Sequence, residues 1–205
     1  MTPWFTDGGK TSPDARWFHD DENAPPMRDR SMTTRIEMRN GGDVDDATEV
    51  TRADLEWLAQ CILLAGSARD RGDHPFGSIV VTADGRTVEG LNTVVTGNDP
   101  TGHAETNVVR LAAQQLSPDQ LATSTLYTST EPCAMCAGAI YWSGIGRVVF
   151  ALSEQGLAAI VAEQEGVPTM HLPCREVFAR GGRRVVVAGP VELPAAVDVH
   201  EGFWI

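Results

Sequence analysis

The stretch that decides the fold is EPCAMCAGAIYWSGIGRVVFAL, residues 131–152. Pro132 suits the first turn of a helix, because its missing N–H would have no partner there, and Gly144 suits the end of the apolar run that follows. The next segment, RVVFAL at residues 147–152, is a continuous apolar run typical of a strand buried on both faces. The β-branched segment STLYTST, residues 124–130, predicts another strand just before the helix. Strand, helix and strand in this order indicate an α/β fold.

The same alternation extends to both sides of this stretch. Residues 51–69 have apolar positions at helical spacing, and Thr51 with Asp54 resembles a capping box. Residues 77–95 read as two strands around an Ala-Asp-Gly-Arg turn. Further helices are predicted at residues 103–116, 154–166 and 173–182, a last strand at 183–189, and a closing helix at 194–204. Because the central runs are nearly all apolar, we predict a three-layer α/β/α sandwich with a sheet covered on both faces.

Residues 1–50 differ from the rest of the chain. They carry 6 Lys/Arg against 11 Asp/Glu and show little hydrophobic periodicity. We predict an N-terminal extension that is flexible or loosely docked, followed by a single domain at residues 51–205. The aromatic pairs Trp4-Phe5 and Trp17-Phe18 favour docking onto the domain or onto a second subunit.

Charge and composition limit the classes of partner. The formal net charge is −12, which disfavours a nucleic-acid phosphate backbone as partner, and the only Lys or Arg in residues 102–125 is Arg110. No stretch reads as a signal peptide, and none approaches the roughly 18 consecutive apolar residues of a membrane span. We therefore expect a cytoplasmic protein without membrane contact, in which a Cys-x-x-Cys pair serves a metal or redox chemistry.

The two cysteines of residues 131–152 are the centre of the predicted site. Cys133 and Cys136 lie three residues apart at a helix start, so they share one face, and the helix N-terminus favours their thiolates. His103 opens another predicted helix and Glu105 follows two residues later. Residues i and i+2 do not share a helix face, so His103 must lie at the loop–helix junction if both side chains reach one metal. Taken alone, the cysteines could equally be a structural or redox pair, and Glu105 an exposed first-turn carboxylate.

The combination His-x-Glu and Pro-Cys-x-x-Cys is the pattern of the zinc nucleobase deaminases. Over about residues 53–150 the sequence resembles the cytidine/deoxycytidylate deaminase superfamily, and within it the branch with guanine deaminase, cytosine deaminase and the tRNA adenosine deaminases. The resemblance is carried by HPFGSIVV (74–81), GLNTVV (90–95), NDPTGHAE (98–105) and residues 131–152. It implies a central mixed, mostly parallel five-stranded sheet and a homodimer.

The resemblance also implies the parts of the site. One Zn²⁺ per subunit would be held by His103, Cys133 and Cys136, with a fourth position open for water. Glu105 would transfer protons as general acid and base. The expected substrate-binding residues are Asn92, Phe76, Ala104, Glu154 and Trp204, the last as part of an aromatic C-terminal lid.

These features predict hydrolytic deamination of a small free nucleobase or nucleoside, with release of ammonia. A guanine-type aminopurine is the first candidate, and cytosine or a triazine analogue the second. Two alternatives stay open: a tRNA wobble-adenosine deaminase, and a catalytically inactive zinc-bound scaffold. The sequence does not decide which base is preferred, because the deciding positions lie in loops and at the C-terminus, outside the motif.

Overall fold

A computed structural model describes residues 48–161 and 170–204. The predicted extension at residues 1–50 and the end of the helix predicted at 154–166 lie largely outside the described residues. The elements in chain order are α1 (Arg52–Asp70), β1 (Gly77–Val81), β2 (Thr87–Leu91), α2 (Ala104–Gln115), α3 (Pro118–Ala122), β3 (Thr125–Thr130), α4 (Ala134–Ser143), β4 (Arg147–Leu152), α5 (Glu154–Val161), α6 (Cys174–Ala179), β5 (Val186–Ala188) and α7 (Pro194–Asp198).

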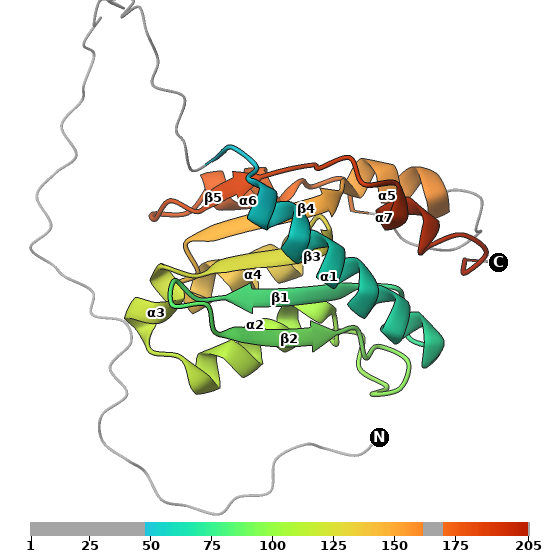
Figure 1. The fold of residues 1–205 in the computed structure, drawn as a ribbon, viewed down its shortest axis with the longest axis horizontal. Helices are drawn as coiled ribbons and strands as arrows, with labels where there is room; N and C mark the ends of the chain where they lie inside the picture. The colour runs from blue at the N-terminus through green and yellow to red at the C-terminus, as the bar shows by residue number, and fades with distance from the viewer. Residues whose placement is uncertain (1–47, 162–169, 205) are drawn as a thin grey trace, which may run out of the picture. The chain divides into compact units, whose positions relative to one another are not determined.

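The strands form one five-stranded mixed sheet in the order β2-β1-β3-β4-β5 (Figure 1). Strand β1 is antiparallel to both of its neighbours, whereas β3, β4 and β5 are parallel to one another. It follows that β2, β3, β4 and β5 all point in the same direction and that β1 alone is reversed. The predicted mixed, mostly parallel five-stranded sheet is therefore confirmed.

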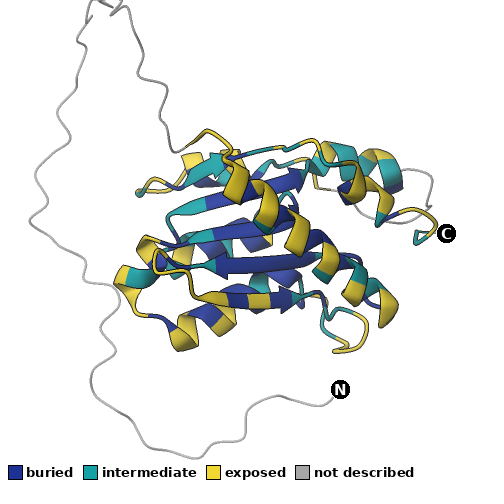
Figure 2. Cartoon of the chain, viewed as in Figure 1, coloured by how far each residue is buried: buried dark blue, intermediate teal, exposed yellow. Residues whose placement is uncertain are grey.

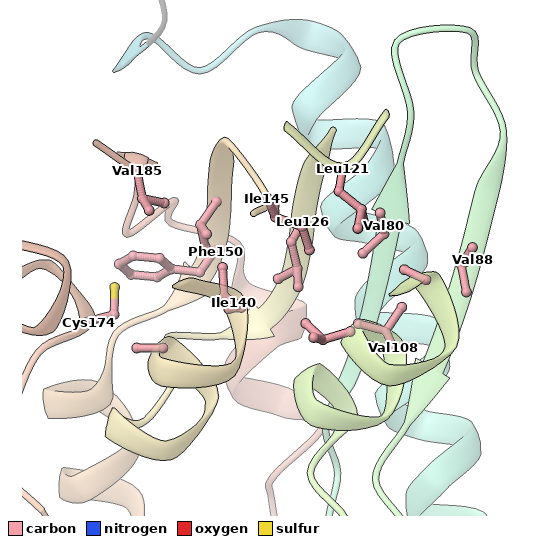
Figure 3. Packing of buried hydrophobic residues seen from close by; sticks show 14 of the residues in the cluster. Val80, Val88, Val108, Leu121, Leu126, Ile140, Ile145, Phe150, Cys174 and Val185 are labelled. Carbon is pink, nitrogen blue, oxygen red and sulfur yellow. The ribbon is translucent and has the colours of Figure 1, made fainter. Parts of the chain in front are cut away.

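Helices cover both faces of the sheet, and the strand residues alternate between the two cores. On one face Leu126, Val148 and Phe150 pack with residues of α2, α4 and α6 in the cluster that Figure 3 shows. On the other face Tyr127 and Val149 pack with residues of α1 and α7. In Figure 2 the sheet is mostly dark blue and the outer sides of the helices are yellow, which indicates a sheet shielded from water on both sides. The predicted three-layer α/β/α sandwich is confirmed.

Helix α1 starts at the predicted capping box. The Thr51 backbone N–H donates to Asp54 Oδ2 at 2.8 Å, and the Asp54 N–H donates to Thr51 Oγ1 at 3.2 Å. Asp54 also accepts hydrogen bonds from the Arg147 guanidinium of β4 and the Tyr127 hydroxyl of β3, at 2.7 Å each. This buried cluster fixes the start of α1 against the two central strands.

Some element ends differ from the prediction. The last strand covers 186–188, not 183–189, because the Arg183 guanidinium turns away to cap the end of α4, donating to the Ile140 and Ile145 carbonyls at 3.0 and 2.9 Å. The closing helix ends at Asp198 and turns follow it. Helix α3 was not predicted, although Ser117 and Gln120 form a capping box around its first-turn proline. None of the helices in the described part of the chain is long and apolar enough to cross a bilayer.

Candidate active site

The site lies where helices α2 and α4 begin. Helix α2 follows β2 and helix α4 follows β3, and these two strands point the same way, so both helix N-termini lie at one edge of the sheet. His103 is the N-cap residue of α2 and Cys133 the N-cap residue of α4. Neither side chain caps its own helix, so both are left to face each other. The predicted position of His103 at the loop–helix junction is confirmed.

Three donor atoms form a compact triangle at this edge. The Cys133 and Cys136 sulfurs are 3.5 Å apart, and His103 Nδ1 lies 3.7 Å from Cys133 Sγ and 3.5 Å from Cys136 Sγ. Zinc bonds of about 2.3 Å to sulfur and 2.0–2.1 Å to nitrogen give tetrahedral edges of roughly 3.5–3.8 Å. The three residues therefore fit Zn²⁺. The sulfurs are too far apart for a disulfide, which needs about 2.05 Å.

The electrostatics of the triangle also suit a cation. The hydrogen bond from the Cys136 thiol, helped by His103, lowers the pKa of Cys133 to about 4. The same contact and burial raise the pKa of Cys136 well above its ordinary range. Two sulfurs this close do not both ionise readily by themselves, whereas a bound metal ion favours two thiolates.

Glu105 lies in the first turn of α2, next to the triangle. Its side chain is buried, its Oε1 accepts a hydrogen bond from Thr128 Oγ1 at 3.1 Å, and its Oε2 lies 3.6 Å from Cys136 Sγ. Burial, together with the negative charge of Cys133, raises the pKa of the Glu105 carboxyl. A raised pKa suits a carboxyl that must both accept and release a proton during a reaction.

A cavity of about 70 Å³ opens onto this group. It is lined by Phe76, His103, Glu105, Thr130, Glu131, Cys133, Glu154 and Leu157. Three buried polar atoms of this region have no hydrogen-bond partner among the described residues: Asn92 Nδ2, Thr130 Oγ1 and Glu154 Oε2. Buried polar groups are normally paired, so these atoms are candidates for hydrogen bonds with a ligand.

Not every predicted site residue lines the cavity. Phe76 and Glu154 do, whereas Asn92 and Ala104 are fully buried and do not line it; the Asn92 N–H donates to the carbonyl of the lining residue Phe76 at 3.1 Å. The ring centroids of Trp204 and Phe76 are 6.2 Å apart, and Trp204 Nε1 donates to His200 Nδ1 at 3.2 Å. The lid formed by Trp204 stays a prediction.

The role of the Glu131 side chain was not predicted. Its Oε2 accepts from the Glu154 backbone N–H at 3.1 Å, and its Oε1 from the Cys174 N–H at 3.0 Å, so one carboxylate holds the starts of α5 and α6. Burial and the charge of Glu131 together raise the pKa of Glu154 to about 7. Thr128 and Thr130 were missed too. Their spacing of two places them on the same face of β3, toward α2, and could have revealed them.

Comparison with known proteins identifies the family. Residues 51–152 match the profile of the cytidine and deoxycytidylate deaminase zinc-binding region. A probable cytosine deaminase from Schizosaccharomyces pombe is 38% identical over 158 residues, covering 77% of this chain and 96% of that protein. The chain belongs to the cytidine and deoxycytidylate deaminase superfamily.

Other relatives in this deaminase superfamily differ in the substrate that their names state. Guanine deaminase from Bacillus subtilis is 48% identical over 96 residues, which are 46% of this chain and 62% of that protein. The solved structure of NE0047 in complex with 2,6-diaminopurine aligns with a TM-score of 0.60 at 27% identity, over 76% of this chain and 83% of that one. tRNA-specific adenosine deaminases are among the relatives as well. The comparisons thus establish a deaminase, and the names of its relatives state several different substrates.

Proposed function

We propose that the domain at residues 51–205 catalyses the zinc-dependent hydrolytic deamination of a small free nucleobase or nucleoside. A guanine-type aminopurine is the first substrate and cytosine or a triazine analogue the next. The observation that carries this proposal is the triangle of His103, Cys133 and Cys136 beside the buried carboxyl of Glu105. All three donor atoms of the triangle lie within 4.8 Å of one another, and Glu105 is not a member of that group. The Glu105 carboxyl is therefore available for proton transfer.

His103 and the two thiolates would hold the zinc ion. When bound, zinc supplies Lewis-acid chemistry that makes water a nucleophile at neutral pH. Glu105 takes the proton of the water that attacks the amine-bearing carbon and gives it to the neighbouring ring nitrogen. The same carboxyl then moves the second water proton to the departing amine, so the products are a carbonyl base and ammonia. The hydrogen bond from Thr128 holds the Glu105 carboxylate in place during these transfers.

The polar atoms around the cavity favour a base with both acceptors and donors on its edge. Asn92 Nδ2 offers an unpaired donor, and Glu154 Oε2 an unpaired acceptor. A guanine-type base presents a ring-nitrogen or carbonyl acceptor to the first and N–H groups to the second. Phe76 would cover the face of the ring, the Ala104 backbone would meet its edge, and Trp204 would close the open side.

A homodimer is part of the proposal. Helix α4 has no charged residue and is apolar on all sides, yet Trp142 is 85% exposed and Met135 38% exposed. A helix of this kind is normally covered by protein. We expect Trp142→Glu to convert a dimer to a monomer in sedimentation equilibrium, while a substitution at the exposed Leu63 of α1 leaves the dimer intact.

The alternatives are less well supported. A chain of net charge −12 repels the phosphate backbone of a tRNA, although tRNA-specific adenosine deaminases are relatives. An inactive scaffold would be expected to close the metal site with a fourth protein ligand. The described residues offer three donors in the group and keep a buried Glu105 next to it.

The deciding experiment measures ammonia release by the zinc-loaded protein. The panel contains guanine, cytosine, adenine, their nucleosides, an aminotriazine and a tRNA anticodon stem-loop. Glu105→Gln should lower the rate by about 10²–10⁴-fold with zinc content unchanged, while Glu56→Gln, an exposed carboxylate of α1, should not alter it. Release from the stem-loop alone would favour the tRNA alternative, and silence across the panel with zinc bound would favour the scaffold.

A further inference from the structure

The turn after α1 carries a buried carboxylate, Asp73, that no step of the proposed reaction uses. It contacts the loop that joins β2 to α2, residues 92–103. That loop begins at Asn92, the proposed base-binding residue, and ends at His103, a proposed zinc ligand. The Asp73 side chain is fully buried.

Asp73 binds the middle of the loop through three hydrogen bonds. Its Oδ1 accepts from the Val95 N–H at 3.1 Å and from the Thr96 N–H at 2.9 Å, and its Oδ2 accepts from Thr96 Oγ1 at 2.8 Å. Although burial alone would raise the pKa of Asp73, the bonds from Thr96 and Val95 outweigh it and lower the pKa. The group is therefore a carboxylate that organises backbone N–H donors around itself.

Arg71 links the same carboxylate to Asn92. Its Nη2 donates to Asp73 Oδ2 at 3.2 Å and to the Asn92 carbonyl at 2.9 Å. The Asn92 N–H in turn donates to the Phe76 carbonyl at 3.1 Å. The backbone of Asn92 is thus held on both sides.

The orientation of the Asn92 amide follows from the loop. Its Oδ1 accepts from the Val94 N–H at 3.0 Å. A backbone N–H can only donate, so the oxygen of the amide must face Val94 and the nitrogen must face away from it. Val94 immediately precedes the two residues that Asp73 holds, and Nδ2 is the atom left buried without a partner among the described residues.

We propose that Asp73 is a positioning residue for the deamination: by fixing residues 95 and 96 it places the Val94 N–H that orients Asn92 Nδ2 toward the base. This inference rests on the proposed function, in which Asn92 donates to the substrate. A merely structural Asp73 would affect folding and leave the action of Asn92 unchanged.

The test is a double-mutant cycle between Asp73→Asn and Asn92→Ala. For the base that the zinc-loaded protein deaminates, kcat and KM are measured, and calorimetry gives the Kd of 2,6-diaminopurine as a readout that needs no turnover. Asp73→Asn should raise KM and Kd about tenfold or more in the native background and less than twofold in the Asn92→Ala background. Zinc content should stay at the native level.

Two further variants keep the result interpretable. Thr96→Val removes only the hydroxyl donor to Asp73, so it should raise KM about threefold even if Asp73→Asn fails to fold. Asp54→Asn removes another buried carboxylate, which lies at the opposite end of α1 from Asp73, and it should lower thermal stability without changing KM.

The outcomes separate the two proposals. Additive effects of Asp73→Asn and Asn92→Ala would overturn the positioning role while leaving the deamination intact. An Asn92→Ala variant with native KM and Kd would overturn both the Asn92 contact and the positioning role. Absence of both turnover and binding in the native protein would overturn the proposed substrate class and this inference with it.

Discussion

Two buried carboxylates, Asp54 on α1 and Glu105 on α2, have opposite surroundings. Asp54 Oδ1 accepts from Arg147 and Tyr127, and Oδ2 accepts from Thr51 and from Arg147 again. Glu105 accepts one bond from the Thr128 hydroxyl and a long contact from the Cys136 thiol.

The difference is visible in the pKa values. Burial would raise the pKa of Asp54, but the Arg147 ion pair and the other donors lower it well below its ordinary value of 3.8. Burial raises the pKa of Glu105, and its surroundings do not compensate. A fully paired carboxylate stabilises a scaffold, whereas an incompletely paired one beside a cavity marks a site whose remaining partner is a ligand.

The largest effect should follow from removing a donor of the metal triangle. Cys136→Ala should lower bound zinc from about one per chain to under a tenth and abolish ammonia release, because two donors hold zinc far more weakly than three. Zinc is measured by atomic absorption after gel filtration. The matched control is Cys61→Ala, since Cys61 is a buried free cysteine on α1. Equal zinc in both variants would mean that the triangle is not the metal site.

The second-largest effect should be on stability, and it concerns Asp54. Asp54→Asn should lower the free energy of unfolding by about 3 kcal/mol, because it removes the negative charge of the buried ion pair between Asp54 and Arg147, and kcat should not change. The folded-state pKa of Asp54 lies below 3.8, so its stabilisation is present above that pH and is lost as pH falls through the folded pKa. The difference in free energy of unfolding between the native protein and Asp54→Asn, measured by urea unfolding, should therefore be smaller at pH 3 than at pH 7.

If Asp54→Asn lost more activity than its unfolded fraction explains, Asp54 would act on the site and not only on stability. Arg147→Met, measured in the same way, removes the opposite partner of the pair. It should destabilise by a similar amount.

The sequence predicted those parts of the molecule that depend on local signals. The capping box of α1, the start of α4 just after Pro132 and its end at Gly144, which has φ 91°, are each encoded within a few residues. The positions of His103 and Cys133 at two helix N-termini followed from the order of strands and helices. Their meeting at one sheet edge then needs only the parallel direction of β2 and β3.

The parts that were missed depend on contacts between residues far apart in the chain. Glu131 caps helices that start 23 and 43 residues later, and Asp73 holds a loop 22 and 23 residues away. No local pattern distinguishes such a carboxylate from an exposed one. Single acidic residues next to turns were for this reason outside the reach of the sequence.

The third prediction concerns Glu154, whose pKa is about 7 because of burial and the charge of Glu131. As pH falls below 7 the carboxylate gains a proton, so it loses its negative charge and one of its oxygens donates, where the N–H groups of the base need two charged acceptors. The native kcat/KM should therefore fall on acidification, and Glu154→Gln should lower the pH 8 value by about 10–100-fold and remove that part of the profile. Glu176→Gln, an exposed carboxylate of α6, is the control. An unchanged profile in Glu154→Gln would place the titrating group elsewhere.

The smallest effect should come from the single hydroxyl that supports Glu105. Thr128 is fully buried and its Oγ1 lies 3.1 Å from Glu105 Oε1, so Thr128→Val keeps the shape and removes the donor. We expect kcat to fall about tenfold with zinc content and KM unchanged, since one hydrogen bond to a charged group is worth about 1.5 kcal/mol. Thr125→Val, at the first residue of β3, should keep the native kcat. A loss as large as that of Glu105→Gln would mean that Thr128 itself takes part in proton transfer, and no loss would mean that the Glu105 carboxylate is held by the zinc site alone.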